Sequence, residues 1–228
     1  MEEFFGKNGR TMESRLISNT DYFSLTRPEI ISRIPGSVSR VLDIGCGYGS
    51  LGSSLKATRS AIEYYGIDSE PSAAEHLKGI ANGFWISNLN VFDWTQVGKY
   101  DCIVAADVLE HLVDPWSTVA HIKDHLTQDG VLIVSVPNIG NINIVGRLIL
   151  RGEWKYEESG ILDITHLRFF TRKSAIRMIS EAGFEIESVG ENLENLKGWR
   201  AFLTLPFRIF FPELFVVQYI FRAKIRDL

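Results

Sequence analysis

The feature that most constrains this chain is a glycine-rich turn that directly follows an apolar run. The segment Val38–Ile44 is rich in apolar and β-branched residues, and it leads into Gly45, Gly47 and Gly49. A buried strand that ends in alternating glycines is typical of a βα unit, because glycine adopts positive φ and lets a ligand approach the backbone closely. The sequence therefore predicts an α/β domain with a ligand at this turn.

Short apolar runs recur along the chain and alternate with segments of helical periodicity. This alternation is typical of βα units, in which helices cover a mostly parallel sheet. The predicted strands are Val38–Ile44, Ile62–Ile67, Trp85–Val91, Tyr100–Ala105, Val131–Val136, Phe184–Val189 and Leu214–Arg222. The sequence therefore predicts an α/β fold with a doubly wound sheet of seven strands.

Two helices carry clear signals at their ends. Asp114 followed by Pro115 is typical of an N-cap and a first helical residue, and Gly130 is expected to stop this helix. Thr171 is expected to open a second helix, which Gly183 closes. Both helices follow predicted strands, as a βα arrangement requires.

Composition favours one globular domain and excludes several classes of protein. Of 228 residues, 45% are apolar and 23% are charged, which excludes a disordered or collagen-like chain. A net charge of −4 provides no positive electrostatic field that would attract nucleic acid. The two cysteines, Cys46 and Cys102, and an N-terminus without the apolar core of a signal peptide favour a cytoplasmic location.

The glycine-rich turn also narrows the choice of ligand. Gly47-x-Gly49-x-x-Gly52 matches a dinucleotide fingerprint, and Asp68 follows the second strand, where a carboxylate would accept hydrogen bonds from ribose hydroxyls. Asp43 precedes the first glycine by two residues and would repel a pyrophosphate, whereas it would attract the sulfonium and ammonium groups of S-adenosylmethionine. This charge argument favours the methyl donor, and an NAD-dependent oxidoreductase stays open as the alternative.

Four motifs carry a family resemblance. They are Val41–Gly49, Asp68, Phe92–Trp94 and Asp107–Leu112. In order and spacing they resemble the class I S-adenosylmethionine-dependent methyltransferases, in particular small-molecule enzymes such as the ubiquinone-biosynthesis O-methyltransferases. The resemblance implies the methyltransferase variant of the doubly wound fold, with an antiparallel last strand near Leu214–Arg222.

The resemblance also implies a role for each motif. The glycine loop would hold the methionine end of the cofactor, Asp68 the ribose, and Asp93 the adenine amino group, with neighbouring residues framing the ring. The implied cofactor-binding residues are Asp43, Gly45, Cys46, Gly47, Gly49, Asp68, Phe92, Asp93, Trp94 and Asp107. A non-catalytic module that binds S-adenosylmethionine would keep the same motifs, so it is a second alternative.

One long connection does not fit the alternation of strands and helices. Asn138–Phe170 spans about thirty residues, a length typical of a lid or binding loop. Within it, Leu162–Thr171 resembles a stretch of methyltransferases associated with cell-surface polysaccharide biosynthesis. This second resemblance implies a glycan-type acceptor, alongside the more general class of small molecules.

Several side chains of this connection are candidates for contact with the acceptor. Trp154 and Tyr156 are expected to stack on a sugar or aromatic ring, and His166 and Arg168 to hydrogen-bond its hydroxyls or an anionic group. If the acceptor is a hydroxyl, His111 and His166 are the candidate catalytic bases, because imidazole titrates near neutral pH. The predicted reaction is in-line transfer of a methyl group to an oxygen, with nitrogen as the less favoured acceptor atom.

Metal ligation is not predicted. Asp107, Glu110, His111 and Asp114 lie close together in the sequence, but they are expected at strand-end, loop and helix-cap positions. A metal would have to compete with those structural roles. We therefore expect no metal ligand among the candidate catalytic and cofactor-binding residues.

The domain layout follows from these assignments. We expect a single domain over 1–228, with a leading helix in 1–36, a cofactor-binding half in 38–137, a substrate or lid loop in 138–170, and a C-terminal helix with the last strands in 171–228. The apolar segment Trp199–Phe211 is expected to form core or subunit contacts. Because arginines accompany it, peripheral contact with a membrane surface is the alternative.

Overall fold

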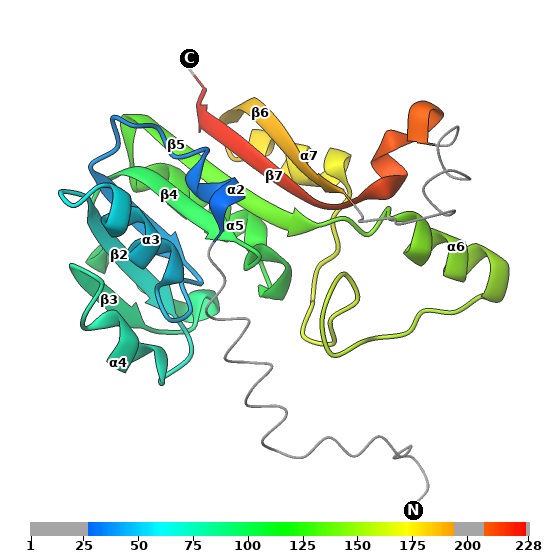
Figure 1. Ribbon diagram of the computed structural model, residues 1–228, viewed down its shortest axis with the longest axis horizontal. Coiled ribbons are helices and arrows are strands. Elements are labelled where there is room, and N and C mark those ends of the chain that lie inside the picture. Colours follow the sequence, from blue (N-terminus) through cyan, green and yellow to red (C-terminus); the bar gives the residue numbers. More distant parts are fainter. Residues whose placement is uncertain (1–26, 194–207, 227–228) are drawn as a thin grey trace, which may run out of the picture.

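A computed structural model describes residues 27–193 and 208–226 and contains one seven-stranded sheet (Figure 1). The strands are β1 (Arg40–Ile44), β2 (Glu63–Asp68), β3 (Gly83–Ile86), β4 (Tyr100–Ala106), β5 (Leu126–Pro137), β6 (Phe184–Leu193) and β7 (Val216–Ile225). Their order is β3-β2-β1-β4-β5-β7-β6. Because β7 runs antiparallel to both β5 and β6, the prediction of a mostly parallel sheet with an antiparallel last strand is confirmed.

Helices cover both faces of this sheet, and its central strands β1 and β4 are accordingly buried along almost their whole length. On one face lie α2 (Pro28–Ile31), α3 (Ser50–Thr58) and α4 (Ala73–Leu77); on the other lie α5 (Pro115–Asp124) and α7 (Arg172–Glu181). Side chains along β4 alternate between the two cores: Ile103 packs with α5 and α7, and Val104 packs with α3 and α4. The sheet is thus the middle layer of three.

The predicted helix starts are confirmed by their caps. The Asp114 side chain accepts a hydrogen bond from the Ser117 backbone N–H at 3.1 Å. Thr171 and Ser174 form a reciprocal capping box at the start of α7. Gly183, with a φ of +90°, lies between α7 and β6. The starts of both helices could therefore be predicted from the local sequence alone.

Several predicted boundaries differ from the structure: the last strand, for example, begins at Val216 and not at Leu214. Two other differences are larger. The strand expected over Trp85–Val91 ends at Ile86. The Ser87 N–H donates the last hydrogen bond of the pairing with β2, to the Asp68 carbonyl, and a short 3-10 helix, η1 (Leu89–Val91), follows. The helix expected to stop at Gly130 ends at Asp124, and β5 begins directly afterwards with an irregular first stretch. In both cases pairing within the sheet outweighs the local pattern.

The predicted leading helix lies mostly outside the described residues. Of the expected span 1–36, the structure describes 27–36, in which α2 has only four residues. The apolar segment Trp199–Phe211 is likewise described only from residue 208, and its exposed part includes Ile209, Phe210 and Phe211. No helix within the described ranges has the length and apolar character needed to cross a membrane.

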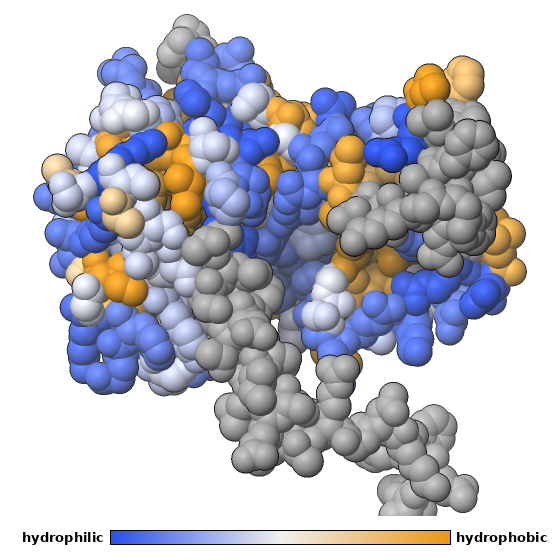
Figure 2. All heavy atoms as spheres, viewed as in Figure 1, coloured by the Kyte–Doolittle hydropathy of each residue, from blue (hydrophilic) through white to orange (hydrophobic). Residues whose placement is uncertain are grey.

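The connection 138–170 is more ordered than the expected loop. It contains α6 (Ile142–Arg151), which begins at the Asn141 cap and ends at Gly152 with a φ of +63°. Figure 1 shows α6 at the right-hand end of the molecule, and Figure 2 shows apolar side chains gathered there. The connection is closed at its base, where Asn138 bridges to Phe170 and the Ile139 N–H donates to the Phe170 carbonyl at 2.9 Å.

Candidate active site

A pocket of about 850 Å³ lies at the edge of the sheet where the parallel strands end. Ligands in open α/β sheets bind at this edge. Its wall combines residues that follow β1, β2, β3 and β4 with residues from the connection 138–170. The two halves of the predicted site, for cofactor and for acceptor, therefore open into one space.

The glycine loop forms one end of this pocket by folding back onto the end of β2. The Gly45 and Cys46 N–H groups donate to the Ile67 carbonyl at 2.8 and 3.1 Å. The Gly47 N–H donates to Asp68 Oδ2 at 2.7 Å, with Gly47 at a φ of +53° that a branched side chain cannot adopt without strain. Backbone therefore faces the pocket here, as the sequence predicted.

Asp68 organises this end of the pocket as well as lining it. Its second oxygen, Oδ1, accepts a hydrogen bond from the Glu70 N–H at 2.8 Å. Each carboxylate oxygen can accept more than one hydrogen bond, so both keep capacity for a ribose hydroxyl. The structure thus gives Asp68 a structural role and leaves the predicted binding role available.

Asp43 lies buried beneath the glycine loop and lines the same pocket. Burial raises the pKa of its carboxyl to about 7, although the Tyr64 hydroxyl, which donates at 2.7 Å, and the Arg27 guanidinium both act to lower this pKa. The charge of Asp68 raises it further. A carboxyl poised in this way ionises when a cationic group binds beside it.

The Phe92–Trp94 segment does not line this pocket. Asp93 caps the short helix η2 (Trp94–Gln96) by accepting from the Thr95 N–H at 3.0 Å. These residues line a separate hollow, where His121 and His125 stack on Trp94. The large pocket is lined instead by residues 87–90, directly after β3, which the sequence analysis missed because it extended that strand to Val91.

Asp107 lines the pocket at the end of β4, but its carboxylate is already engaged. One oxygen pairs with the Arg27 guanidinium at 2.6 Å, and the other accepts from Ser135 at 2.9 Å and from Gln218 at 2.6 Å. Its φ of +54° is strained for a residue other than glycine. Arg27, which also lines the pocket, could not be found from the sequence, since it is eighty residues away from Asp107.

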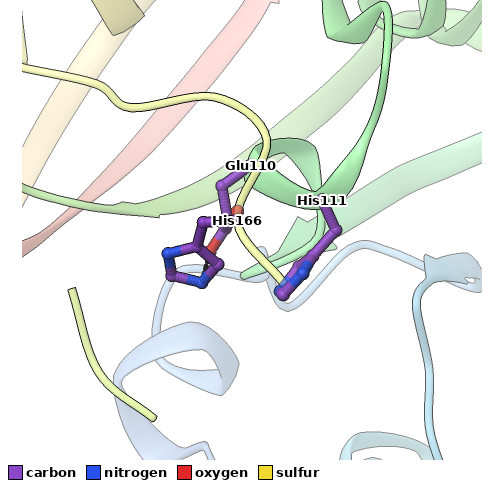
Figure 3. A group of neighbouring side chains, drawn as sticks. All are labelled: Glu110, His111 and His166. Atoms are coloured by element: carbon purple, nitrogen blue, oxygen red, sulfur yellow. Dashed lines mark ion pairs between the residues drawn. The ribbon is translucent and has the colours of Figure 1, made fainter. Parts of the chain in front are cut away.

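The two candidate catalytic histidines come together at the opposite end of the pocket. His111 belongs to the short helix η3 (Leu109–His111) and lines the pocket, whereas His166 comes from the long connection and lies behind it. Their ring centroids are 4.7 Å apart. Figure 3 shows the carboxylate of Glu110 beside these rings, with His166 Nε2 4.0 Å from Glu110 Oε1.

Burial shifts the pKa values of this group. The pKa of Glu110, which is 1% exposed, is raised well above its usual range by burial and then by the charge of Asp107. The pKa of His111 is lowered by burial and then by the neighbouring His166. Burial therefore disfavours the charged form of both side chains.

Hydrogen-bond partners define which nitrogen of each ring carries a proton. The Thr165 hydroxyl donates to Asp163 at 2.6 Å, so its oxygen accepts from His111 Nδ1, 3.1 Å away. His166 Nδ1 lies 3.1 Å from the Ile161 carbonyl, which can only accept. Both rings are therefore held with the lone pair on Nε2.

The other residues proposed for acceptor contact lie outside the pocket. The Arg168 guanidinium donates to the carbonyls of Val113 and Leu167 and so holds the connection in place. Trp154 and Tyr156 are partly exposed and pack around Phe169. The pocket wall from this connection consists instead of Glu158, Ser159, Asp163, Ile164 and Thr165.

Comparison with known proteins identifies the family to which this fold belongs. The family model described as a methyltransferase domain matches residues 9–189, most of the chain. The chain belongs to this methyltransferase family. Membership of this family favours S-adenosylmethionine over NAD as the cofactor, so the oxidoreductase alternative is set aside.

Individual relatives of this methyltransferase are distant. Trans-aconitate 2-methyltransferase from Escherichia coli is 29% identical over 48% of this chain and 44% of its own length. A ubiquinone biosynthesis O-methyltransferase from Glaesserella parasuis is 31% identical over 43% of this chain and 45% of its own. The chain thus spans less than half the length of these relatives.

Solved structures support the same fold across almost the whole chain. A crystal structure of an S-adenosylmethionine-dependent methyltransferase from Clostridium acetobutylicum has a TM-score of 0.61, covering 94% of this chain and 98% of that one. The sequence identity is only 11%. The similarity therefore concerns the fold of the methyltransferase and not its acceptor.

Proposed function

We propose that this methyltransferase transfers a methyl group to a hydroxyl oxygen of a small molecule, with a sugar-containing molecule as the preferred acceptor. The observation that carries the proposal is the single pocket shared by the glycine loop and His111. Gly47, Asp43 and Asp68 line one end, and His111 lines the other together with the polar side chains of Ser159 and Thr165. A donor held at the first end faces an acceptor held at the second.

The main contribution of the protein to this reaction is to position the methyl donor and the acceptor relative to each other. The acceptor oxygen attacks the methyl carbon in line at roughly 3–3.5 Å, and the electron pair of the breaking carbon–sulfur bond remains on the sulfur. The leaving thioether is neutral and needs no proton. The hydroxyl proton passes to a base, and His111 Nε2 carries a lone pair at the pocket wall for this purpose.

The polar wall at the acceptor end supports a hydroxylated acceptor. Asp163 and Thr165 are already hydrogen-bonded to each other, and both line the pocket with Ser159. Carboxylate and hydroxyl oxygens at such a wall accept from sugar or phenol hydroxyls. The name of one relative, an O-methyltransferase of ubiquinone biosynthesis, also specifies oxygen as the methylated atom.

A transfer assay with a radiolabelled methyl group tests the proposal. The purified chain would be incubated with labelled S-adenosylmethionine and a panel of sugars, phenols, carboxylic acids and amines, with Gly47→Val as the inactive control. We expect label in a product that survives mild alkali, as a methyl ether does. Label found only in alkali-labile methyl esters, or only on nitrogen, would overturn the assignment to hydroxyl oxygen.

A further inference from the structure

A buried carboxylate without a hydrogen bond lies behind the acceptor end of the pocket. Glu110 is 1% exposed, and within the described part of the chain neither of its carboxylate oxygens has a hydrogen-bond partner. Burying an unpaired carboxylate costs several kcal/mol unless a proton or a cation compensates. The side chain is therefore placed where a proton or a bound cation has to offset its charge.

The two imidazole rings beside this carboxylate present nitrogen lone pairs and not N–H donors. His166 Nε2, 4.0 Å from Glu110 Oε1, carries its lone pair because Nδ1 donates to the Ile161 carbonyl. His111 Nε2 is in the same state because Nδ1 donates to Thr165. One ligand atom from each of the three residues lies within 4.8 Å of the other two. Three possible metal-ligand atoms thus lie close together, as Figure 3 shows for their side chains.

The surrounding backbone and side chains hold this arrangement from outside. The N–H groups of Leu167 and Arg168 donate to the Glu110 carbonyl at 2.8 and 2.9 Å, which docks the connection onto η3. The Asp163–Thr165 pair orients the ring of His111 in turn. Metal-binding histidines commonly donate their second ring N–H to an oxygen in this manner.

We propose that Glu110, His111 and His166 bind one divalent transition-metal ion, with Zn²⁺ as its representative. Two imidazoles and one carboxylate form a ligand set suited to Zn²⁺, Mn²⁺ or Fe²⁺, whereas Mg²⁺ and Ca²⁺ prefer oxygen alone. Ligands about 2.1 Å from a tetrahedral ion lie about 3.4 Å apart, so the three side chains close slightly on binding. Three protein ligands leave a coordination position for another molecule.

The position of the ion gives it a role in the proposed reaction. Because His111 lines the pocket while Glu110 and His166 lie behind it, the ion occupies the pocket wall at the acceptor end. There it can bind the acceptor hydroxyl and lower the pKa of that hydroxyl. In the metal-bound protein the ion would take the place of His111 as the aid to deprotonation, because the Nε2 lone pair of His111 is then bound to the metal. The proton then leaves to solvent, oxygen bonds to the methyl carbon, and sulfur keeps the electron pair. This role rests on the proposed function, whereas binding of the ion does not.

The test is a titration of the full chain, stripped of metal with a chelator, with ZnCl2 in the absence of cofactor and acceptor. We expect one Zn²⁺ per chain, with affinity reduced at least about hundredfold by Glu110→Gln and by His166→Ala, since loss of an outer partner alone costs up to that much. His121→Ala is the matched control. His121 on α5 and His125 at its C-terminal cap both stack on Trp94 and are the alternative imidazole pair.

Binding of S-adenosylhomocysteine shows whether each variant is folded, and Glu110→Gln should bind it as the parent chain does. Failure of the parent chain to bind Zn²⁺ at micromolar concentration would overturn the site, as would a loss of binding that follows His121→Ala and spares Glu110→Gln. Methyl transfer to a hydroxyl by a parent chain that fails to bind Zn²⁺ would overturn the metal site and leave the proposed function standing. Zn²⁺ binding with methyl transfer only to another atom would refute the proposed function alone.

Discussion

The two ends of the pocket are built in different ways. The cofactor end is made from turns that directly follow β1, β2 and β3, so its residues lie within about fifty positions of one another. The acceptor end joins η3 to a connection that returns about fifty residues later, and two backbone hydrogen bonds to the Glu110 carbonyl hold the junction. The sheet itself therefore shapes the cofactor end, while the acceptor end depends on a docked segment.

This difference separates the effects that substitutions should have. A change in the glycine loop should affect cofactor affinity and leave the acceptor end assembled. A change at the junction should affect turnover and leave cofactor affinity intact. Five predictions, beginning with the largest effect, test that separation and the charge state of Asp43.

Gly47→Val should weaken binding of S-adenosylhomocysteine by at least about hundredfold, or about 2.7 kcal/mol. Valine disfavours the φ of +53°, and its branched side chain would occupy the face that the ligand approaches. Calorimetry measures the affinity, and circular dichroism checks the fold. Gly79→Ala is the control, since a Cβ there meets nothing within 4 Å. Normal affinity in folded Gly47→Val would show that the loop is only a turn.

Thr165→Val should lower turnover by between about 10- and 100-fold without changing affinity for S-adenosylhomocysteine. The substitution keeps the shape of the side chain but removes the hydroxyl that links Asp163 to His111. Steady-state kinetics and calorimetry measure the two quantities separately. Thr165→Ser should restore turnover, because it restores the hydroxyl. A parallel loss of cofactor affinity and turnover would mean that the two ends are not separable.

Affinity for S-adenosylhomocysteine should rise about tenfold between pH 6 and pH 8, with release of a proton on binding. The cause is Asp43, whose pKa is about 7 in the free protein and falls when the ammonium group of the ligand arrives. Tyr64, Arg27, Asp68 and Cys46 are the titratable or charged groups that face it. Calorimetry in buffers of different ionisation enthalpy measures the proton. In Asp43→Asn both the pH dependence and the proton release should disappear.

The same carboxyl has a predictable effect on stability. In the folded, unliganded protein Asp43 keeps its proton up to about pH 7, whereas in the unfolded chain it loses the proton near its ordinary value of 3.8. The free energy of unfolding should therefore decrease through this group as pH rises across that window, and Asp43→Asn should remove this contribution.

Arg168→Ala should have the smallest effect, a loss of about 1 kcal/mol in the free energy of unfolding. Its guanidinium donates to the Val113 and Leu167 carbonyls and does not line the pocket. Chemical denaturation measures the change, with Arg177→Ala on α7 as a surface control. An unchanged denaturation curve combined with a large rise in KM would instead place Arg168 in contact with the acceptor.

The same contrast explains how much the sequence could predict. The glycine loop and Asp68 could be placed because a strand followed by glycines constrains its own turn. The residues after β3 were missed by a few positions, because only pairing with β2 shows that the strand ends at Ile86. The register of the sheet, not the local pattern, thus brings residues 87–90 to the pocket.

At the acceptor end, sequence reasoning identified His111 and His166 but not their relation to Glu110. Residues that are neighbours in the chain did not indicate a metal site, because the third member of the group, His166, comes from a segment folded back onto η3. The helix α6 was also missed, although Asn141 and Gly152 are ordinary cap residues at its ends. A periodic search within the long connection would have found it.

The closed base of the connection 138–170 has a consequence for how such enzymes diversify. Because Asn138 and Phe170 are paired where the chain leaves and re-enters the sheet, the intervening residues can change in length or sequence with little entropic penalty to the rest of the fold. Residues 139–169 thus form a cassette. Exchanging this segment between relatives should change which acceptor is methylated and leave binding of the methyl donor unchanged.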